Sequence, residues 1–382
     1  LALLERKLGV KADSRGNHVT LEGGRDGCEQ ARRVLEHLYE ALKRGRDIVA
    51  EGAEAPPMPL SLEEQQALVE YRNRVGQLTD ERADELAELQ RRRHLAAQMG
   101  GAAAVARYKA RGRHTARERI AMLLDDGSFR ELGRITGKGR YDEEGRLLDL
   151  QAVNAIIGTG RIEGRKLVVS ADDYTIRAGS SEGTISDKWV YAERVALAQH
   201  LPLVRLVDTA GGSVKLLQQQ AASKIPGYAN WPGVELLKTV PVVGVALGAC
   251  AGLGAVKVLL SHFSVMVRDQ AQVFAAGPPV VKQAYGIDID KNDLGGYKVH
   301  RKSALVHNEA VDEADALRQV RQFLSYLPRS AHQLPARAAS TDDPARAEDW
   351  LKDAIPRDRR KIYDPRRIMA ALFDRDSIFE IG

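Results

Sequence analysis

The sequence predicts an α/β fold in which short buried strands alternate with helices. Two observations carry this prediction: several short runs rich in β-branched residues or leucine, and a helical pattern between them, Ser186 to Gln199. Chains with this alternation form layered sheets whose ligands bind near strand ends and helix starts. The predicted strands are Ala152 to Gly160, Lys166 to Ser170, Leu203 to Val207 and Val240 to Leu247.

Length and composition place the chain among soluble globular proteins. Its 382 residues are 44% hydrophobic, 29% charged and 5% aromatic, which is enough for two domains or for one large domain with appendages. The net charge of +5 and the pI of about 9.1 fit phosphate-bearing small ligands or an acidic partner. Because aromatic residues are few, the charge indicates nucleic acid only weakly.

The cysteines and the N-terminal segment indicate the compartment. Cys28 and Cys250 lie too far apart for a disulfide framework or a zinc finger, so we expect a reducing cytoplasm and no bound metal. The first residues have a charged helical pattern without the apolar stretch of a signal peptide. Since the chain begins at Leu1 and stops within a pattern, we expect a fragment at both ends.

Residues 1–50 have the pattern of a small α+β unit. Two short strands, Val10 to Ala12 and His18 to Leu21, precede an amphipathic helix, Glu29 to Arg44. Gly24 to Gly27 has the G-x-x-G spacing of a KH backbone clamp, although a plain turn is favoured for the same residues. A linker with three prolines follows at residues 51–60. The stretches that resemble the KH-like N-terminal domain of PhoH-like ATPases are Leu4 to Val10, Arg15 to Asn17 and Val34 to Tyr39.

Helices are predicted between the linker and the first strand of the large sheet. Ser61 to Met99 is charge-rich and helical, and Gly100 and Gly101 end it. In the next stretch, Val105 to Leu124, we expect apolar side chains to face the core and cations to stay in water. The apolar residues are Ile120, Leu123 and Leu124, and the cations are Lys109, Arg111, Arg113, Arg117 and Arg119.

Three strand ends rich in small residues form the candidate site. The last lies within Val240 to Val256, an uncharged run long enough to raise the question of a membrane span. Pro241 and closely spaced glycines interrupt it, so we predict a strand, a glycine turn and a helix. Glycines admit close backbone approach, and a helix start offers free N–H groups to negative charge, although a turn without a ligand is the alternative. The three strand ends are Asp173 to Ser180, Asp208 to Gly212 and Gly248 to Ala255.

These strand ends belong to a longer ordered pattern that resembles the carboxyltransferase (β) subunit of biotin-dependent acyl-CoA carboxylases, of the propionyl-CoA and methylcrotonyl-CoA carboxylase type. The resemblance covers the chain from near Glu88 onward. It implies a crotonase-like (ClpP/crotonase) spiral domain, preceded here by a helical segment and the α+β unit. The matching motifs are His114 to Ile120, Leu123 to Phe129, Asp173 to Ser180, Asp208 to Gly212, Gly248 to Ala255, Gly277 to Lys282 and Asp293 to Gly296, followed by His300.

The resemblance also implies the chemistry. A carboxyl group passes from carboxybiotin on a partner protein to the α-carbon of an acyl-CoA, through an enolate whose oxygen backbone amides hold. The amide donors carried over are Gly252, Leu253 and Gly254, with Gly211 and Gly212 shaping the neighbouring wall. Leu253 stands where the family has adjacent glycines, so its side chain must fit near the acyl group. The implied acyl-CoA contacts are Arg177, Ala178, Gly179, Ser180, Ala210 and Cys250, with Arg177 a candidate phosphate ligand.

The same resemblance predicts the domains and partners. Residues 61–345 would be the acyl-CoA-binding domain, and residues 346–382 a linker and the start of a second domain that faces carboxybiotin across a subunit interface. The expected partners are a biotin carboxylase and biotin carrier subunit and further copies of the chain, with no membrane and with nucleic acid only through residues 1–50. The alternatives are the α subunit of a biotin-dependent decarboxylase, or a fragment that binds acyl-CoA or RNA without catalysis. The acyl chain length is left open. Because the implied site forms between subunits, we expect this fragment by itself to bind CoA thioesters without turning them over.

Overall fold

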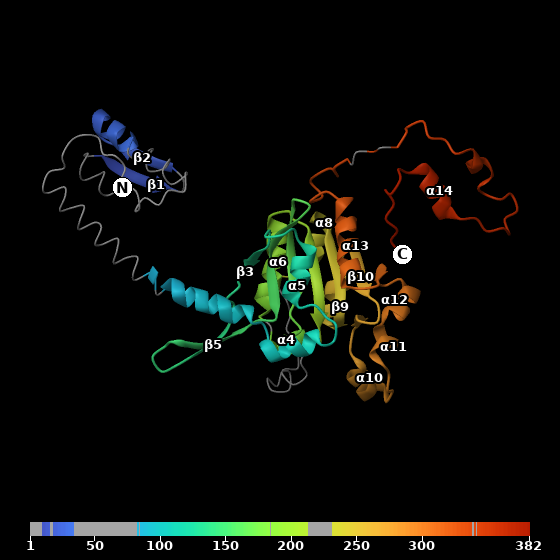
Figure 1. Ribbon diagram of the computed structural model, residues 1–382, viewed down its shortest axis with the longest axis horizontal. Coiled ribbons are helices and arrows are strands. Elements are labelled where there is room, and N and C mark those ends of the chain that lie inside the picture. The colour runs from blue at the N-terminus through green and yellow to red at the C-terminus, as the bar shows by residue number, and fades with distance from the viewer. Residues whose placement is uncertain are drawn as a thin grey trace. The chain divides into compact units, whose positions relative to one another are not determined.

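The computed structural model describes residues 10–15, 18–33, 82–83, 85–183, 185–212, 231–337, 340 and 342–382 (Figure 1). Contacts divide the chain into two compact units, residues 1–83 and residues 84–382. Among the described residues, the smaller unit holds a two-stranded sheet and the larger unit holds the main sheet.

In the smaller unit, β1 (Lys11–Arg15) pairs antiparallel with β2 (His18–Glu22). Both predicted strands are therefore confirmed, with slightly shifted ends. Residues 25–33 are helical, and Cys28 donates its N–H to the carbonyl of Gly24, 3.0 Å away. The predicted plain turn at Gly24 to Gly27 is thus wrong, because the helix already begins there. The rest of the predicted helix, residues 34–44, and the linker at 51–60 lie outside the described residues.

The larger unit is built on an eight-stranded sheet with the order β12, β10, β9, β8, β7, β6, β3, and with β11 paired to β9. All pairings among strands β7 to β12 are parallel, whereas β6 pairs antiparallel with both β7 and β3. The four predicted strands are confirmed as β6 to β9, although β9 extends past Leu247. The bounds are β3 Arg130–Leu132, β6 Ala155–Ile162, β7 Arg165–Asp172, β8 Leu203–Thr209, β9 Val242–Ala251, β10 Phe263–Val267, β11 Gln272–Phe274 and β12 Asn308–Ala310.

Helices cover both faces of this sheet (Figure 1): α5 and α13 pack on one face, and α6 and α8 on the other. The helix predicted over Ser186 to Gln199 is confirmed as α6. The bounds are α4 Ala102–Lys109, α5 Ala116–Leu123, α6 Ser186–Ala198, α8 Gly233–Thr239, α9 Leu253–Leu259, α10 Pro278–Tyr285, α11 Lys291–Gly295, α12 Tyr297–Ser303, α13 Glu313–Ser325 and α14 Pro365–Leu372, with short 3-10 turns η1 Arg177–Gly179, η2 Ser181–Gly183 and η3 Asp349–Asp353.

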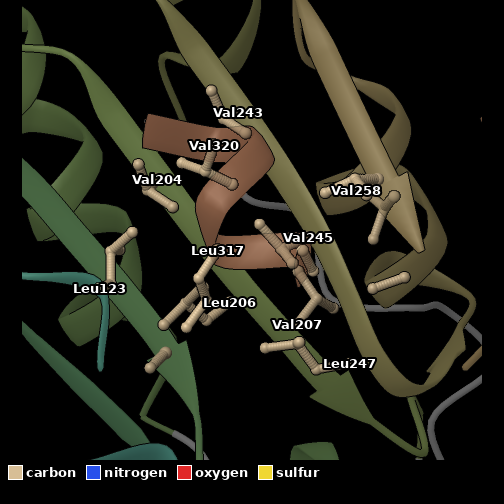
Figure 2. Packing of buried hydrophobic residues seen from close by; sticks show 14 of the residues in the cluster. Leu123, Val204, Leu206, Val207, Val243, Val245, Leu247, Val258, Leu317 and Val320 are labelled. Carbon is tan, nitrogen blue, oxygen red and sulfur yellow. The ribbon is translucent and has the colours of Figure 1, made fainter. Parts of the chain in front are cut away.

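The core lies between α13 and the central strands (Figure 2). Leu206 of β8 and Val245 of β9 pack in one cluster with Leu317 and Val320 of α13. Leu203, also of β8, packs in a second cluster with residues of α6 and α8. Strand β9 is buried along most of its length, and its sequence is a continuous apolar run without polar alternation. Every residue of β8 is buried as well, including the charged Arg205 and Asp208.

Helix α5 begins at a capping box, in which the Thr115 side chain accepts from the Glu118 N–H and the Glu118 carboxylate accepts from the Thr115 N–H. Ile120 and Leu123 face the core, as predicted. Arg119, however, is only 1% exposed, so the prediction that it stays in water is wrong. A separate hairpin, β4 (Gly137–Tyr141) with β5 (Leu147–Ala152), follows β3.

The C-terminal residues 342–382 reach back to the sheet. The ring of Phe379 lies 5.4 Å from that of Phe263 and 6.3 Å from that of Tyr326. The Asn308 side chain donates to the carbonyl of Glu380 and accepts from the N–H of Gly382, both at 3.2 Å. Within the described ranges, no helix has the length and apolar character needed to cross a membrane.

Candidate functional site

The three strand ends rich in small residues lie against one another at the carboxyl ends of β7, β8 and β9. A Cβ built on Gly179 would lie 2.5 Å from the carbonyl oxygen of Asp208. A Cβ on Gly211 would lie 2.7 Å from the carbonyl oxygen of Ala251. Only glycine allows such approaches, so these glycines permit main chain to pack on main chain. The segments predicted to form one site are therefore neighbours.

The loop after β7 holds an unusual backbone conformation. Arg177 and Ala178 both have left-handed φ angles, 51° and 53°, and are followed by Gly179 at 66°. Non-glycine residues adopt this conformation rarely and at a cost, so the surroundings must hold it. Here the Ala178 carbonyl accepts from the Ala210 N–H at 2.9 Å, and Thr209 Oγ1 donates to the Gly179 carbonyl at 2.6 Å. The Arg177 side chain stays exposed.

The loop continues into buried polar contacts with the end of β8. Ser180 is buried, and its carbonyl accepts from Asn154 Nδ2 at 2.7 Å. The Gly211 N–H donates to Thr209 Oγ1 at 3.1 Å, so that amide is already used. The Gly212 N–H has no hydrogen-bond partner among the described residues.

The turn between β9 and α9 presents two further free amides. Gly252 has φ 57°, and its N–H donates to the Phe274 carbonyl at 3.0 Å. The first hydrogen bond of α9 runs from Val256 N to the Gly252 carbonyl at 3.2 Å. In the part of the chain that the structure describes, the N–H groups of Leu253 and Gly254 have no partner. Gly252 therefore shapes this turn, and Leu253 and Gly254 supply its open donors.

The Leu253 side chain lies in an apolar cluster with Trp189, Val190 and Ala155, beside Trp231. The Trp189 and Trp231 rings meet edge to face with centroids 5.6 Å apart. Because the Leu253 side chain packs in this cluster, a leucine between two glycines leaves the turn able to present its N–H groups.

Lys257 ties α9 to the sheet. Its Nζ lies 3.0 Å from Asp172 Oδ1 at the end of β7 and 4.7 Å from the centroid of the Trp189 ring. Both charged side chains are nearly buried. The ion pair and the cation–π contact fix the helix that begins with the open amides.

Cys250 is fully buried, with its Sγ 3.5 Å from the carbonyl oxygens of Val207 and Gly248. Burial raises the pKa of the Cys250 thiol well above its usual range. A buried thiol is unreactive, so the side chain fills space and is no nucleophile.

Sequence reasoning missed a buried ionic network beneath the site. Arg119 makes two hydrogen bonds to the Glu313 carboxylate, at 2.7 and 2.9 Å, and its Nη1 lies 3.0 Å from Asp208 Oδ2. The Tyr108 hydroxyl also donates to Asp208 Oδ2. Burial raises the pKa of Asp208, against the opposing effect of Arg119. No local pattern separates Arg119 from the half-buried Arg117, because both carboxylates come from distant parts of the chain.

A cavity of about 420 Å³ opens beside the network, over the ends of β8, β9 and β11. Its wall includes the stacked rings of Tyr108 and Tyr174, 5.6 Å apart, and the cations Arg113 and Lys291. The carboxylates of Asp208 and Asp290 also line this cavity, so it presents charges of both signs beside an apolar surface. The described residues contain no group of three or more His, Cys, Asp or Glu side chains that could hold a metal ion.

Comparison with known proteins identifies the family. The model of the carboxyl transferase domain matches residues 107–382. The chain belongs to the carboxyl transferase family. The match includes α5 and all three glycine-rich strand ends, and the crotonase-like fold predicted from the resemblance is confirmed.

Two relatives illustrate the range of the carboxyl transferase family. The propionyl-CoA carboxylase carboxyltransferase subunit of Haloferax mediterranei is 31% identical over 301 residues, covering 78% of this chain and 58% of that protein. The methylmalonyl-CoA decarboxylase subunit alpha of Veillonella parvula is 30% identical over 285 residues, covering 74% and 55%. The chain thus spans little more than half the length of these relatives.

A solved carboxyl transferase structure has the same fold. The transcarboxylase 12S hexamer with hydrolysed methylmalonyl-coenzyme A aligns with a TM-score of 0.66 and 28% identity, over 77% of this chain and 56% of that one. The hexameric assembly and the bound coenzyme A ligand are properties of that transcarboxylase.

Proposed function

We propose that the chain is the acyl-CoA-binding part of a biotin-dependent carboxyltransferase, and that main-chain amides at the β8 and β9 strand ends stabilise the enolate. The observation that carries this proposal is the pair of free amides at Leu253 and Gly254, on a turn that packs against the end of β8. Membership of the carboxyl transferase family supports the same reading.

The proposed reaction requires from this chain mainly backbone N–H groups that point at the thioester oxygen. Loss of the proton α to a thioester puts negative charge on the thioester oxygen, and N–H donors aimed there lower the barrier. Leu253 and Gly254 supply them from one turn, and Gly212 from the other, while Gly211 and Gly252 shape the two turns. Carboxybiotin, carried by a partner, supplies the carboxyl group and a nitrogen that accepts the proton.

The coenzyme A portion would lie along the loop after β7. Arg177 is exposed there, and its guanidinium suits a phosphate. Ala178, Gly179 and Ser180, with Ala210 opposite, would form the channel wall through the hydrogen bonds that join the two segments. Cys250 would contribute packing beneath this wall.

The partners follow from the same proposal. A biotin carboxylase and biotin carrier subunit would deliver the carboxyl group, and further copies of the chain would complete the site, in the cytoplasm. Residues 61–345 would form the acyl-CoA domain, and residues 346–382 would lead into a second carboxyltransferase domain. The KH-like reading of residues 1–50 stays a prediction.

Leu253→Pro tests the proposed donors. Leu253 is the first residue of α9, after the cap residue Gly252, and proline is well tolerated at that position because no helical hydrogen bond is lost. The change removes one N–H, so carboxyl transfer to propionyl-CoA in the presence of the biotin partner should fall by about 10²–10³. Propionyl-CoA affinity, measured by calorimetry, should change less than about threefold.

Leu253→Ala is the matched control, because it keeps the N–H and should keep the rate within about threefold. Transfer by Leu253→Pro at the wild-type rate would remove the assigned role of this amide. All transfer assays use the longer protein that includes the second carboxyltransferase domain, because that domain faces carboxybiotin. Absence of transfer by this longer protein to every acyl-CoA tested, from short to long chains, would overturn the function itself.

A decarboxylase α subunit is the second candidate, favoured by the similarity to the Veillonella parvula protein. It would use the same amides with the carboxyl group moving from a carboxylated acyl-CoA to biotin. Methylmalonyl-CoA and propionyl-CoA, assayed in opposite directions with the same carrier, would distinguish the two.

A further inference from the structure

Strands β8 and β9 fall out of register beside the site. Val207 pairs with Ala246, but the next pairing joins Thr209 to Cys250. Strand β9 therefore advances further than β8 across this step, and residues 247–249 bulge opposite Asp208. Bulges re-aim the chain that follows them and are frequent beside active sites.

Side chains hold the bulge. The carbonyl oxygen of Leu247 accepts from Gln270 Nε2 at 2.8 Å, from Arg119 Nη2 at 3.3 Å and from Arg113 Nη1 at 3.4 Å. Gln270 also donates to Glu313, the carboxylate that binds Arg119. The bulge is thus anchored to the buried network through donors from the α5 region and from the segment before β11.

The opposite strand is anchored to the same group. Arg119 Nη1 binds Asp208, which lies across from the bulge and is fully buried. A Cβ on Gly248 would lie 2.1 Å from Asp208 Oδ1, so glycine within the bulge makes room for this carboxylate. One guanidinium therefore contacts both strands, from a helix that Glu313 of α13 holds in place.

We propose that Arg119 is a positioning residue that fixes the distance between the two amide-bearing turns. Asp208 lies four residues before Gly212 on one turn, and Leu247 lies before Leu253 on the other, with the bulge between them. The Arg119 guanidinium binds the Asp208 carboxylate and the Leu247 carbonyl, so it determines how far apart the N–H donors of the two turns lie. The inference rests on the proposed function, because it assigns these amides to one oxyanion.

Arg119→Lys tests this role. Lysine keeps the charge but offers one ammonium group in place of the planar fork, so it cannot bind Asp208, Leu247 and Glu313 in the same geometry. We expect kcat for carboxyl transfer to propionyl-CoA to fall about 10²-fold, with KM within about threefold, because misplaced donors affect the transition state most. Amide hydrogen exchange in peptides covering residues 242–256 should become about tenfold faster, and exchange in residues 155–172 should not change.

Arg117→Lys is the control. Arg117 lies on the same helix and binds Glu131 through two hydrogen bonds, at 2.9 and 3.1 Å, away from both turns. This variant should leave kcat and the exchange of residues 242–256 at wild-type values. Equal behaviour of the two variants in both measurements would overturn the inference.

If Arg119→Lys does not fold, Gln270→Ala takes its place. Gln270 is half-buried and supplies the nearest donor to the Leu247 carbonyl. Its loss should also lower kcat and speed the hydrogen exchange of residues 242–256. The kinetic measurements use the longer protein that includes the second carboxyltransferase domain. If this longer wild-type protein transfers no carboxyl group, the proposed function is contradicted, and the exchange measurement still decides whether Arg119 holds the bulge.

Discussion

Lys188 lies on α6 and is 8% exposed, and no hydrogen bond or ion pair joins its side chain to another of the described residues. Burial lowers the pKa of Lys188 from 10.5 to about 8, partly offset by Glu131. A buried ammonium without a partner is expensive, so this residue weakens the fold at neutral pH.

Lys188→Met should therefore stabilise the protein at pH 7, by about 3 kcal/mol if the whole pKa shift contributes. The folded pKa lies below the unfolded one, so the wild-type penalty is complete below pH 8 and shrinks as the pH rises toward 10.5. The gain from the substitution should shrink over the same window. Urea unfolding of both proteins between pH 8 and pH 10.5 measures the difference in the free energy of unfolding. A difference that does not vary with pH would contradict this account.

The cations of α5 show the limit of sequence reasoning for single residues. Arg117 and Arg119 are two positions apart, yet Arg119 is 1% exposed and Arg117 has a 27% exposed side chain. Helical periodicity treats both as surface residues, because arginine is seldom buried without partners. The partners Asp208 and Glu313 become neighbours only when the sheet and α13 assemble.

At the scale of elements, the turn from β9 to α9 depends on how closely the helix packs on the strand. A Cβ built on Gly244 of β9 would lie 2.3 Å from the carbonyl oxygen of Val258 in α9. That acceptor is main chain and cannot rotate away. The helix could accommodate a larger residue only by moving, and its open amides would move with it.

Gly244→Ala should therefore destabilise the protein by about 1–3 kcal/mol, as overpacked core sites do. Guanidinium unfolding followed by circular dichroism measures the change. Val256→Ala, at a position on the same helix that is 43% exposed, should stay within about 0.5 kcal/mol of the wild type. Equal stability of Gly244→Ala and the wild type would show that α9 has room to shift.

The elements that sequence reasoning recovered are those with strong local patterns. Strands β6 to β9 contain runs rich in β-branched residues or leucine, and α6 has clear helical periodicity. Strands β11 and β12 have three residues each, which is too short for any period to show. The β9 bulge could not be predicted from the sequence either, because it is defined by the pairing register with β8. At the site, the three segments were predicted, but the sequence does not reveal which amides are free, because Phe274 and Thr209 occupy two of them through tertiary contacts.

At the scale of the whole molecule, contacts separate residues 1–83 from residues 84–382. The larger unit contains the sheet, both core clusters that flank it and all the candidate site residues. A unit with its own core is expected to fold by itself.

Removal of residues 1–83 should therefore leave the thermal midpoint of the larger unit within about 2 °C of its value in the full chain. Calorimetry of both proteins provides the measurement, and propionyl-CoA binding provides a check on the site. A midpoint lower by more than about 5 °C would mean that the first unit stabilises the second.

The contact between Asn308 and the C-terminal residues has a consequence for solubility. Strand β12 ends the sheet, and an uncovered edge strand can pair with the edge of another molecule. The Asn308 amide binds Glu380 and Gly382 beside this strand, and Phe379 covers Phe263 nearby. The C-terminal segment therefore lies where it would hinder edge-to-edge association, and its loss should raise the tendency of the protein to aggregate.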